Sequence, residues 1–147
     1  MQVSEEIVAV DPGLGGGYAH LKQGGGIDLH SYLSESIFIE FLLENPNITK
    51  AVIEDVPTFV SNKTSNSSSF KLGYNFGFEV GAVRTRGISL DLVKPKIWQK
   101  GIKGLKPGMG YTQRKRLLAD AAKRKYPDLK VTQKNADALL ILDYYIN

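Results

Sequence analysis

The 147-residue sequence predicts one α/β domain, residues 1–147, built around a mixed sheet. Two short apolar runs, Ile7–Val10 and Ala51–Ile53, are each followed directly by an acid, which is typical of buried parallel strands. Between them, Tyr18–Lys22 and Ile27–Tyr32 flank a glycine-rich turn and predict an antiparallel meander. Helical patterns separate and follow these strands, which favours a layered α/β fold.

The first apolar run ends in Asp11, and Pro12, Gly13 and Gly15–Gly17 follow it. A carboxylate at the end of a buried strand costs free energy unless it is hydrogen-bonded, paired or bound to a metal. The glycines let the backbone turn sharply and let a ligand come close to the acid. Three interpretations are open at this point: a phosphate cradle, a divalent metal site, or a tight hairpin whose Asp caps its own turn.

The second apolar run, Ala51–Ile53, ends in Glu54, and Asp55 comes next. If the two runs are neighbouring parallel strands, Asp11 and Glu54 lie at the same sheet edge, where ligands of open α/β sheets collect. Two converging carboxylates repel each other unless a cation lies between them. A divalent cation at this edge is therefore the sharper prediction.

Length and composition exclude several function classes. The chain is too short for the two-lobed architecture of the actin-like ATPases, so no nucleotide cofactor is expected. There is no cysteine, which excludes disulfides, thiolate metal sites and cysteine nucleophiles. No apolar run is long enough for a membrane span and no signal peptide is visible, so we expect a soluble cytoplasmic protein without a membrane partner.

The charges are segregated along the chain. Between Lys94 and Lys134 there are 13 Lys or Arg and 2 acids, a local charge of +11, whereas the other residues sum to −7. A polyanion held by the basic segment would be presented to carboxylates of the acidic segment, which favours nucleic acid as the partner. The alternative is a solvated basic helix face.

Two helices are predicted before the basic segment. Ser36–Leu43 fits a short helix, and Phe70–Arg86 fits a longer one with glycines at Gly73, Gly77 and Gly81. Glycine lowers helix propensity, so this repeat implies close approach of another backbone. We expect the glycines to pack on the sheet; a helix-to-helix contact with a second copy of the chain is the alternative.

The stretch Val56–Ser69 is polar and predicts a loop before the longer helix. It is either a plain linker or a DNA-contacting loop. In the second case, Phe59 would wedge against a base and Lys63 would approach a phosphate.

The basic segment combines short and long elements. We predict a strand at Ile88–Val93, a helical turn at Lys96–Lys100 with Trp98 as a core anchor, and a basic loop at Gly101–Gly110. A helix capped by Thr112 then runs to about Tyr126.

The last predicted helix carries a third acid. Asn135 stands at its capping position and Asp137 in its first turn, where a carboxylate also compensates the helix dipole. Ala136 and Ala138 are small enough to let this helix end press against the sheet edge. We therefore expect Asp137 to join Asp11 and Glu54.

With these three acids in place, the chain resembles the RuvC-type Holliday junction resolvases of the RNase H-like superfamily, in the compact form of bacteria and phages. The motifs VAVDPGLGGGYA, VIEDVP and NADALLIL carry the resemblance, which covers nearly the whole chain. It implies an RNase H-like fold with a five-stranded mixed sheet flanked by helices. It also implies a homodimer that nicks four-way DNA junctions in paired positions, in the cytoplasm of a bacterium or a phage-infected cell.

The ligand set implies the chemistry. Carboxylate oxygens favour Mg²⁺ or Mn²⁺, and two such ions about 4 Å apart activate a water and stabilise the leaving oxygen. Asp11 is expected to bridge both ions, with Glu54 and Asp137 each holding one side. Lys134 is expected to contact the scissile phosphate or to orient the water.

Phosphate contacts are expected from the basic segment and would make binding strongly salt-dependent. The residues predicted to bind DNA there are Lys100, Lys103, Lys106, Arg114 and Lys115.

One departure from the family pattern concerns a fourth metal ligand. RuvC-type sites carry an Asp or His about one helical turn before the last Asp, where this chain has Gln133 and Lys134. An ammonium group cannot ligate a metal. Three outcomes stay open: three carboxylates suffice, Asp55 substitutes, or the domain binds junctions with weak or no cleavage. A nuclease for flaps or RNA is a further alternative.

Overall fold

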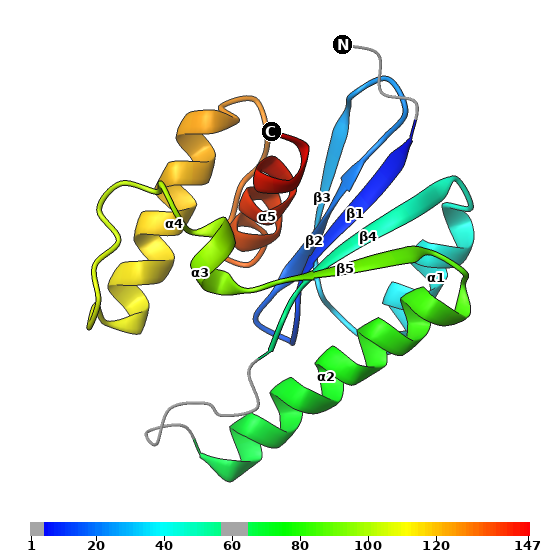
Figure 1. Cartoon of the computed structure of the whole chain (residues 1–147), viewed down its shortest axis with the longest axis horizontal. Helices are drawn as coiled ribbons and strands as arrows, with labels where there is room; N and C mark the ends of the chain where they lie inside the picture. Colours follow the sequence, from blue (N-terminus) through cyan, green and yellow to red (C-terminus); the bar gives the residue numbers. More distant parts are fainter. Residues whose placement is uncertain (1–4, 57–64) are drawn as a thin grey trace.

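A five-stranded mixed sheet of order β3-β2-β1-β4-β5 is the centre of the computed structural model, which describes residues 5–56 and 65–147 (Figure 1). The strands are β1 (Glu6–Asp11), β2 (Gly17–Leu21), β3 (Ile27–Ser31), β4 (Ile48–Glu54) and β5 (Ser89–Val93). The strands β1, β2 and β3 form an antiparallel meander, and β1, β4 and β5 run parallel. The predicted mixed sheet is therefore confirmed.

The helices cover both faces of this sheet (Figure 1). They are α1 (Glu35–Glu44), α2 (Asn66–Thr85), α3 (Pro95–Trp98), α4 (Tyr111–Lys125) and α5 (Ala136–Ile146). Each predicted helix is present, with bounds that differ by a few residues. No helix within residues 5–56 and 65–147 has both the length and the apolar character needed to cross a membrane.

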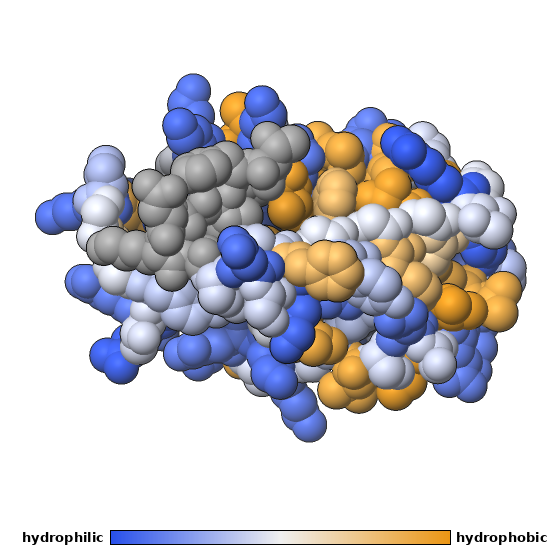
Figure 2. Space-filling view, turned by 90° about the horizontal axis from the view of Figure 1, so that it is seen from below, coloured by the Kyte–Doolittle hydropathy of each residue, from blue (hydrophilic) through white to orange (hydrophobic). Residues whose placement is uncertain are grey.

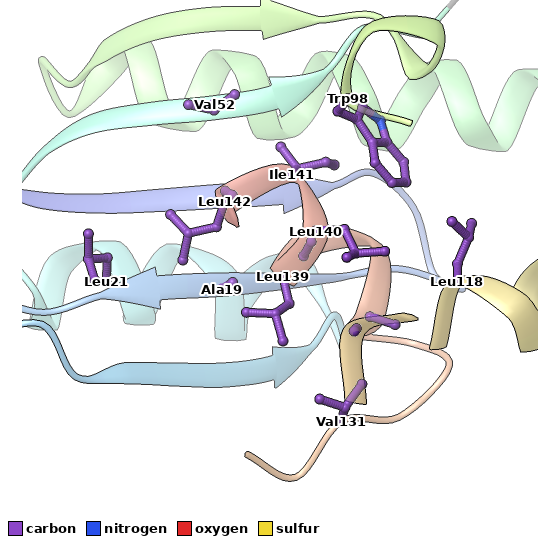
Figure 3. Packing of buried hydrophobic residues seen from close by; sticks show 14 of the residues in the cluster. Ala19, Leu21, Val52, Trp98, Leu118, Val131, Leu139, Leu140, Ile141 and Leu142 are labelled. Atoms are coloured by element: carbon purple, nitrogen blue, oxygen red, sulfur yellow. The ribbon is translucent and has the colours of Figure 1, made fainter. Parts of the chain in front are cut away.

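One face of the sheet packs against α5, with α3 and α4 beside it (Figure 3). Side chains alternate between faces along a strand, so Ile7 and Ala9 of β1 point to this side. The α5 segment from Ala138 to Leu142 is buried along its whole length. Trp98 packs in the same cluster, which confirms its predicted role as a core anchor.

The opposite face packs against α1 and α2. Val8 and Val10 of β1 meet Phe38 and Phe41 of α1 there, together with Val83 of α2. The guanidinium of Arg86 follows α2 and donates hydrogen bonds to four backbone carbonyls, those of Leu42, Asn45, Pro46 and Ile48. This one side chain therefore fixes the end of α1 and the start of β4 against α2.

The start of α2 differs from the prediction. The helix begins at Asn66, so Ser67–Ser69 form its first turn instead of belonging to a loop. The Ser65 hydroxyl oxygen accepts a hydrogen bond from the Ser68 backbone N–H at 3.1 Å, which is a capping contact. Polar composition predicted a loop here because serine is common both in loops and in first helical turns.

The glycines of α2 also differ from the prediction. Gly73, Gly77 and Gly81 are exposed, and no described atom lies within 4 Å of the place where a Cβ would stand on any of them. They do not pack on the sheet. Figure 2 looks onto the side of the molecule that carries α2, where pale and orange atoms form a band with blue atoms around it.

Two predicted caps are also corrected. Gly110, not Thr112, precedes α4, because the helix begins one residue before Thr112. Asn135 precedes α5 as predicted, but its side-chain oxygen accepts from the backbone N–H of Thr132 instead of capping the helix.

Candidate active site

The ends of β1 and β4 and the first turn of α5 enclose one side of a cavity of about 720 Å³. Asp11, Glu54 and Asp137 all line it. Asp11 and Glu54 are the last residues of adjacent parallel strands, which end at the same sheet edge. Asp137 reaches this edge because α5 packs across β1 and β2. The three acids are thus brought together from positions far apart in the sequence.

Asp11 interacts electrostatically with both of the other acids. Its side chain is buried, with 9% of the residue exposed. Burial raises the pKa of Asp11 well above its ordinary value, and the charges of Asp137 and Glu54 raise it further. The nearby ammonium of Lys115 lowers it in part. Additional positive charge near Asp11 would lower its pKa further and favour the ionised carboxylate.

Glu54 is held by Trp98. The indole Nε1–H donates a hydrogen bond to Glu54 Oε2 at 2.7 Å. Burial raises the pKa of Glu54 to about 7, whereas the Trp98 hydrogen bond acts in the opposite direction. Trp98 thereby orients one oxygen of Glu54 and leaves Oε1 available. This contact was not predicted, because the sequence around Trp98 indicates that the residue is buried but does not indicate which group accepts from its indole N–H.

Asp137 is held by Lys115. Lys115 Nζ lies 3.1 Å from Asp137 Oδ2, and each of the two side chains is 12% exposed. The other carboxylate oxygen, Oδ1, is buried and has no hydrogen-bond partner among the described residues. Burial raises the pKa of Asp137, and Lys115 lowers it. Lys115, which was predicted as a phosphate contact, lies in the cavity and is paired with a predicted metal ligand.

Two glycines after Asp11 serve the backbone and not a ligand. A Cβ on Gly16 would overlap the Asp11 carbonyl oxygen, and a Cβ on Gly17 would overlap the His30 carbonyl oxygen. Gly15 has open space around it, and Gly13 adopts a φ of +101°. The predicted room around Asp11 therefore belongs to Gly13 and Gly15, whereas Gly16 and Gly17 allow chain segments to touch.

The remaining predicted site residues lie in three places. Arg114 lines the cavity and donates a hydrogen bond to Gln99 Oε1. Lys134, Lys100, Lys103 and Lys106 are exposed and are not among the residues that line the cavity. Asp55 is half-buried and also does not line it.

Phe59 and Lys63 lie outside the described residues. Lys71 and Asn75 of α2 also line the cavity, although the sequence interpretation assigned them no role.

The donor set fits a hard divalent cation. Within residues 5–56 and 65–147, no group of three or more His, Cys, Asp or Glu side chains is placed so that it could hold a metal ion. Mg²⁺ seldom needs one, because it retains several waters and binds through one or two carboxylates together with substrate phosphates. The buried, unpartnered Asp137 Oδ1 and the mutually repelling Asp11 and Glu54 supply oxygens of the required kind.

Comparison with known proteins gives similarity in structure only. No protein-family model matches the chain, and no curated protein sequence matches it. The structure of Thermus thermophilus RuvC in complex with a Holliday junction substrate superposes with a TM-score of 0.62 at 15% identity, covering 97% of this chain and 94% of that one. A second Thermus thermophilus RuvC structure gives 0.59 at 14% identity, covering 96% and 95%. The chain therefore has the RNase H-like α/β fold of the RuvC structures.

Proposed function

We propose that this protein is a divalent-metal-dependent endonuclease that cuts branched DNA, in particular four-way junctions, by paired nicks. The observation that carries the proposal is the cavity lined by three acids of an RNase H-like sheet edge, the buried Asp11 and Asp137 and the half-buried Glu54, together with Arg114 and Lys115 of α4. The junction substrate in the complex of the RuvC structural neighbour supports the choice of DNA.

Each of the three carboxylates has a separate role in binding the metal ions. Asp11 interacts electrostatically with both of the other acids, since the charges of both raise its pKa, and we expect it to contact both metal ions. Glu54 offers Oε1 and Asp137 offers Oδ1, because Trp98 and Lys115 engage their second oxygens. When bound, two Mg²⁺ or Mn²⁺ ions would activate a water and stabilise the leaving oxygen.

Lys115 and Arg114 supply fixed positive charge on the opposite wall. Lys115 neutralises part of the charge of Asp137, and Arg114 is held in place by Gln99. A scissile phosphate in the cavity could accept hydrogen bonds from the guanidinium of Arg114 and the ammonium of Lys115 while it lies near the metal ligands. The segment that connects α3 to α4 extends this basic surface with Lys100, Lys103 and Lys106, which could contact phosphates on either side of the scissile one.

Paired nicks require two active sites, which a homodimer supplies. The exposed face of α2 and its neighbour α1 offers an apolar groove of about 390 Å³. Ile39, Gly77, Phe78 and Gly81 line this groove, and the open glycines allow a second helix to approach closely. We assign the dimer contact to this C-terminal half of α2.

The test is the change Asp11→Asn. We expect this variant to bind a labelled four-way junction as tightly as the unmodified protein, because the basic residues are retained. Nicking in Mg²⁺ is expected to fall at least 100-fold, and calorimetry should show weakened Mn²⁺ binding. Asp128→Asn, at an exposed acid after α4, is the matched control and should leave both measurements unchanged. Nicking at the unmodified rate by Asp11→Asn would show that the catalytic assignment is wrong.

A substrate panel separates the alternatives. Junction, flap, RNA–DNA hybrid and linear duplex are compared with and without divalent metal. Preferential nicking of the junction supports the proposal, whereas preference for the flap or hybrid assigns a different nuclease activity. Tight junction binding without cleavage in any divalent metal would instead indicate a junction-binding domain.

A further inference from the structure

A second cavity, of about 600 Å³, opens beside the candidate active site. We call it the aromatic groove. It lies between the chain that leads from β3 into α1 and the first turns of α2. The side chains that define it are Tyr32, Leu33, Glu35, Phe70, Lys71 and Tyr74. No role has been assigned to this cavity so far.

The groove presents two neighbouring aromatic rings, and the Tyr74 ring is held by a hydrogen bond. Phe70 and Tyr74 stand one helical turn apart on α2 and are 72% and 52% exposed. Their ring centroids are 6.3 Å apart, with 30° between the ring planes. The Tyr74 hydroxyl donates a hydrogen bond to Glu35 Oε1 at 3.0 Å, which ties the ring to α1. Exposed aromatic faces held in this way are the elements on which nucleobases stack.

The groove is continuous with the candidate active site. Leu14, Lys71 and Asn75 line both cavities. Asn75 is buried, and its side-chain amide donates to the Lys71 carbonyl at 2.9 Å, which fixes the helix turn that carries both residues. The exposed Lys71 ammonium stands at this shared border, where it can meet the phosphate that joins two neighbouring nucleotides.

We propose that the aromatic groove binds an unstacked nucleobase of the cleaved strand, next to the scissile phosphate, and that this contact selects branched DNA over continuous duplex. The inference rests on the proposed nuclease function. A base inside a duplex must be unstacked to enter the groove, at a cost that is smallest where pairing is already interrupted. Continuous stacking is interrupted at a branch point, so a base there is extruded at lower cost than a base inside a linear duplex.

The charge at the border favours a nucleic acid strand over a second copy of the chain as the occupant. A protein surface that sealed the groove would have to cover the Lys71 ammonium and would block the path between the two cavities. A DNA strand instead brings its own phosphate to Lys71. The open glycine face that we assign to the dimer contact lies further along α2, at Gly77 and Gly81.

The test compares an aliphatic with an aromatic replacement at Phe70. Phe70→Leu keeps an apolar side chain and removes the π-face, whereas Phe70→Trp keeps the π-face. Both are made in the Asp11→Asn background so that the DNA strands stay intact. Dissociation constants are measured for a four-way junction and for a linear duplex of the same sequence, at one salt concentration. Tyr144→Leu, an exposed aromatic residue of α5 outside both cavities, is the control.

Phe70→Leu is expected to weaken junction binding about 5- to 150-fold, the range for loss of one base–aromatic stack, and to leave duplex binding unchanged. Phe70→Trp and Tyr144→Leu should keep the junction preference. A 2-aminopurine base placed beside the scissile phosphate should change its fluorescence when the Asp11→Asn protein with Phe70 binds the junction. This change should disappear with Phe70→Leu.

Three results would overturn the inference. Junction preference that survives Phe70→Leu shows that the groove does not read an unstacked base. A shift of Phe70→Leu from dimer to monomer in sedimentation, without a change in the junction preference per dimer, assigns the groove to a second copy. If the Asp11→Asn protein without a groove substitution binds the junction no better than the duplex, the proposed function fails as well. This outcome is seen before any groove variant is compared.

Discussion

Glu79→Gln is expected to change how the stability of the fold depends on pH. Glu79 lies on α2 with no exposed surface, and its carboxylate oxygens have no hydrogen-bond partner among the described side chains; only the Gly13 backbone N–H approaches them closely enough to lower the pKa in part. Burial raises its pKa to about 9, and the charge of Asp11 adds to the effect. The residue is therefore protonated in the folded protein at neutral pH.

The size of the effect follows from proton linkage. The unfolded chain loses the Glu79 proton near pH 4.5, whereas the folded protein keeps it up to about pH 9. Between these values the folded state binds the extra proton, so the free energy of unfolding falls as pH rises, by about 1.4 kcal/mol per pH unit. At pH 7 the accumulated loss is about 3 kcal/mol. Below the pKa of Glu79 in the unfolded chain this loss of unfolding free energy is absent, and above its pKa in the folded protein the loss is complete.

The assay is urea unfolding at pH 5, 6, 7 and 8 in the presence of a chelator. Glu79→Gln should have a shallower dependence on pH than the unmodified protein, because an amide does not titrate. Glu40→Gln, at an exposed position of α1, is the control and should keep the original dependence. Asp11, Glu54 and Asp137 titrate in both proteins, so the difference between the two slopes reports the titration of Glu79 together with its coupling to Asp11. Equal slopes for Glu79→Gln and the unmodified protein would refute the reasoning.

Two further predictions concern side chains that join distant elements. Arg86 donates to four backbone carbonyls at the end of α1 and the start of β4, and the lysine in Arg86→Lys cannot satisfy all four. We therefore expect the free energy of unfolding to fall by about 2–4 kcal/mol, measured by thermal denaturation. An unchanged midpoint would contradict this role of Arg86. Trp98→Phe retains an aromatic ring but removes the N–H that lowers the pKa of Glu54. The pKa of Glu54 should therefore rise, and the acidic limb of the pH–nicking profile should move to higher pH. A profile that does not move would show that this hydrogen bond has no influence on the site.

Much of the fold could be predicted because local signals coincide with the topology. An apolar run that ends in an acid marks both the burial of a strand and its last residue, so Asp11 and Glu54 follow directly once β1 and β4 are parallel neighbours. Asp137 follows from the small residues on either side of it, which let α5 press against the sheet edge. These inferences need only the period of the pattern and the direction of the strands.

The contacts that tune the site could not be predicted in the same way. Lys115 and Asp137 are 22 residues apart, and Trp98 and Glu54 are 44 apart, so each pair depends on how a helix docks beside the sheet. Lys115 belongs to a run of basic residues in which nothing local distinguishes the buried member. Glu79 is different: its helical alignment with the buried Asn75 and Val83, one turn away on each side, marks it as an inward-facing residue.

The charge segregation of the sequence becomes two facing walls in the structure. The sheet edge supplies three carboxylates, and α4 supplies Arg114 and Lys115. Burial is the largest cause of the raised pKa values of Asp11, Glu54 and Asp137, and Lys115 lowers the pKa of all three. A divalent cation bound at these acids would favour their ionised forms and would oppose the effect of burial. Under the proposed function, part of the free energy of metal binding would therefore offset the cost of keeping these carboxylates ionised at the sheet edge.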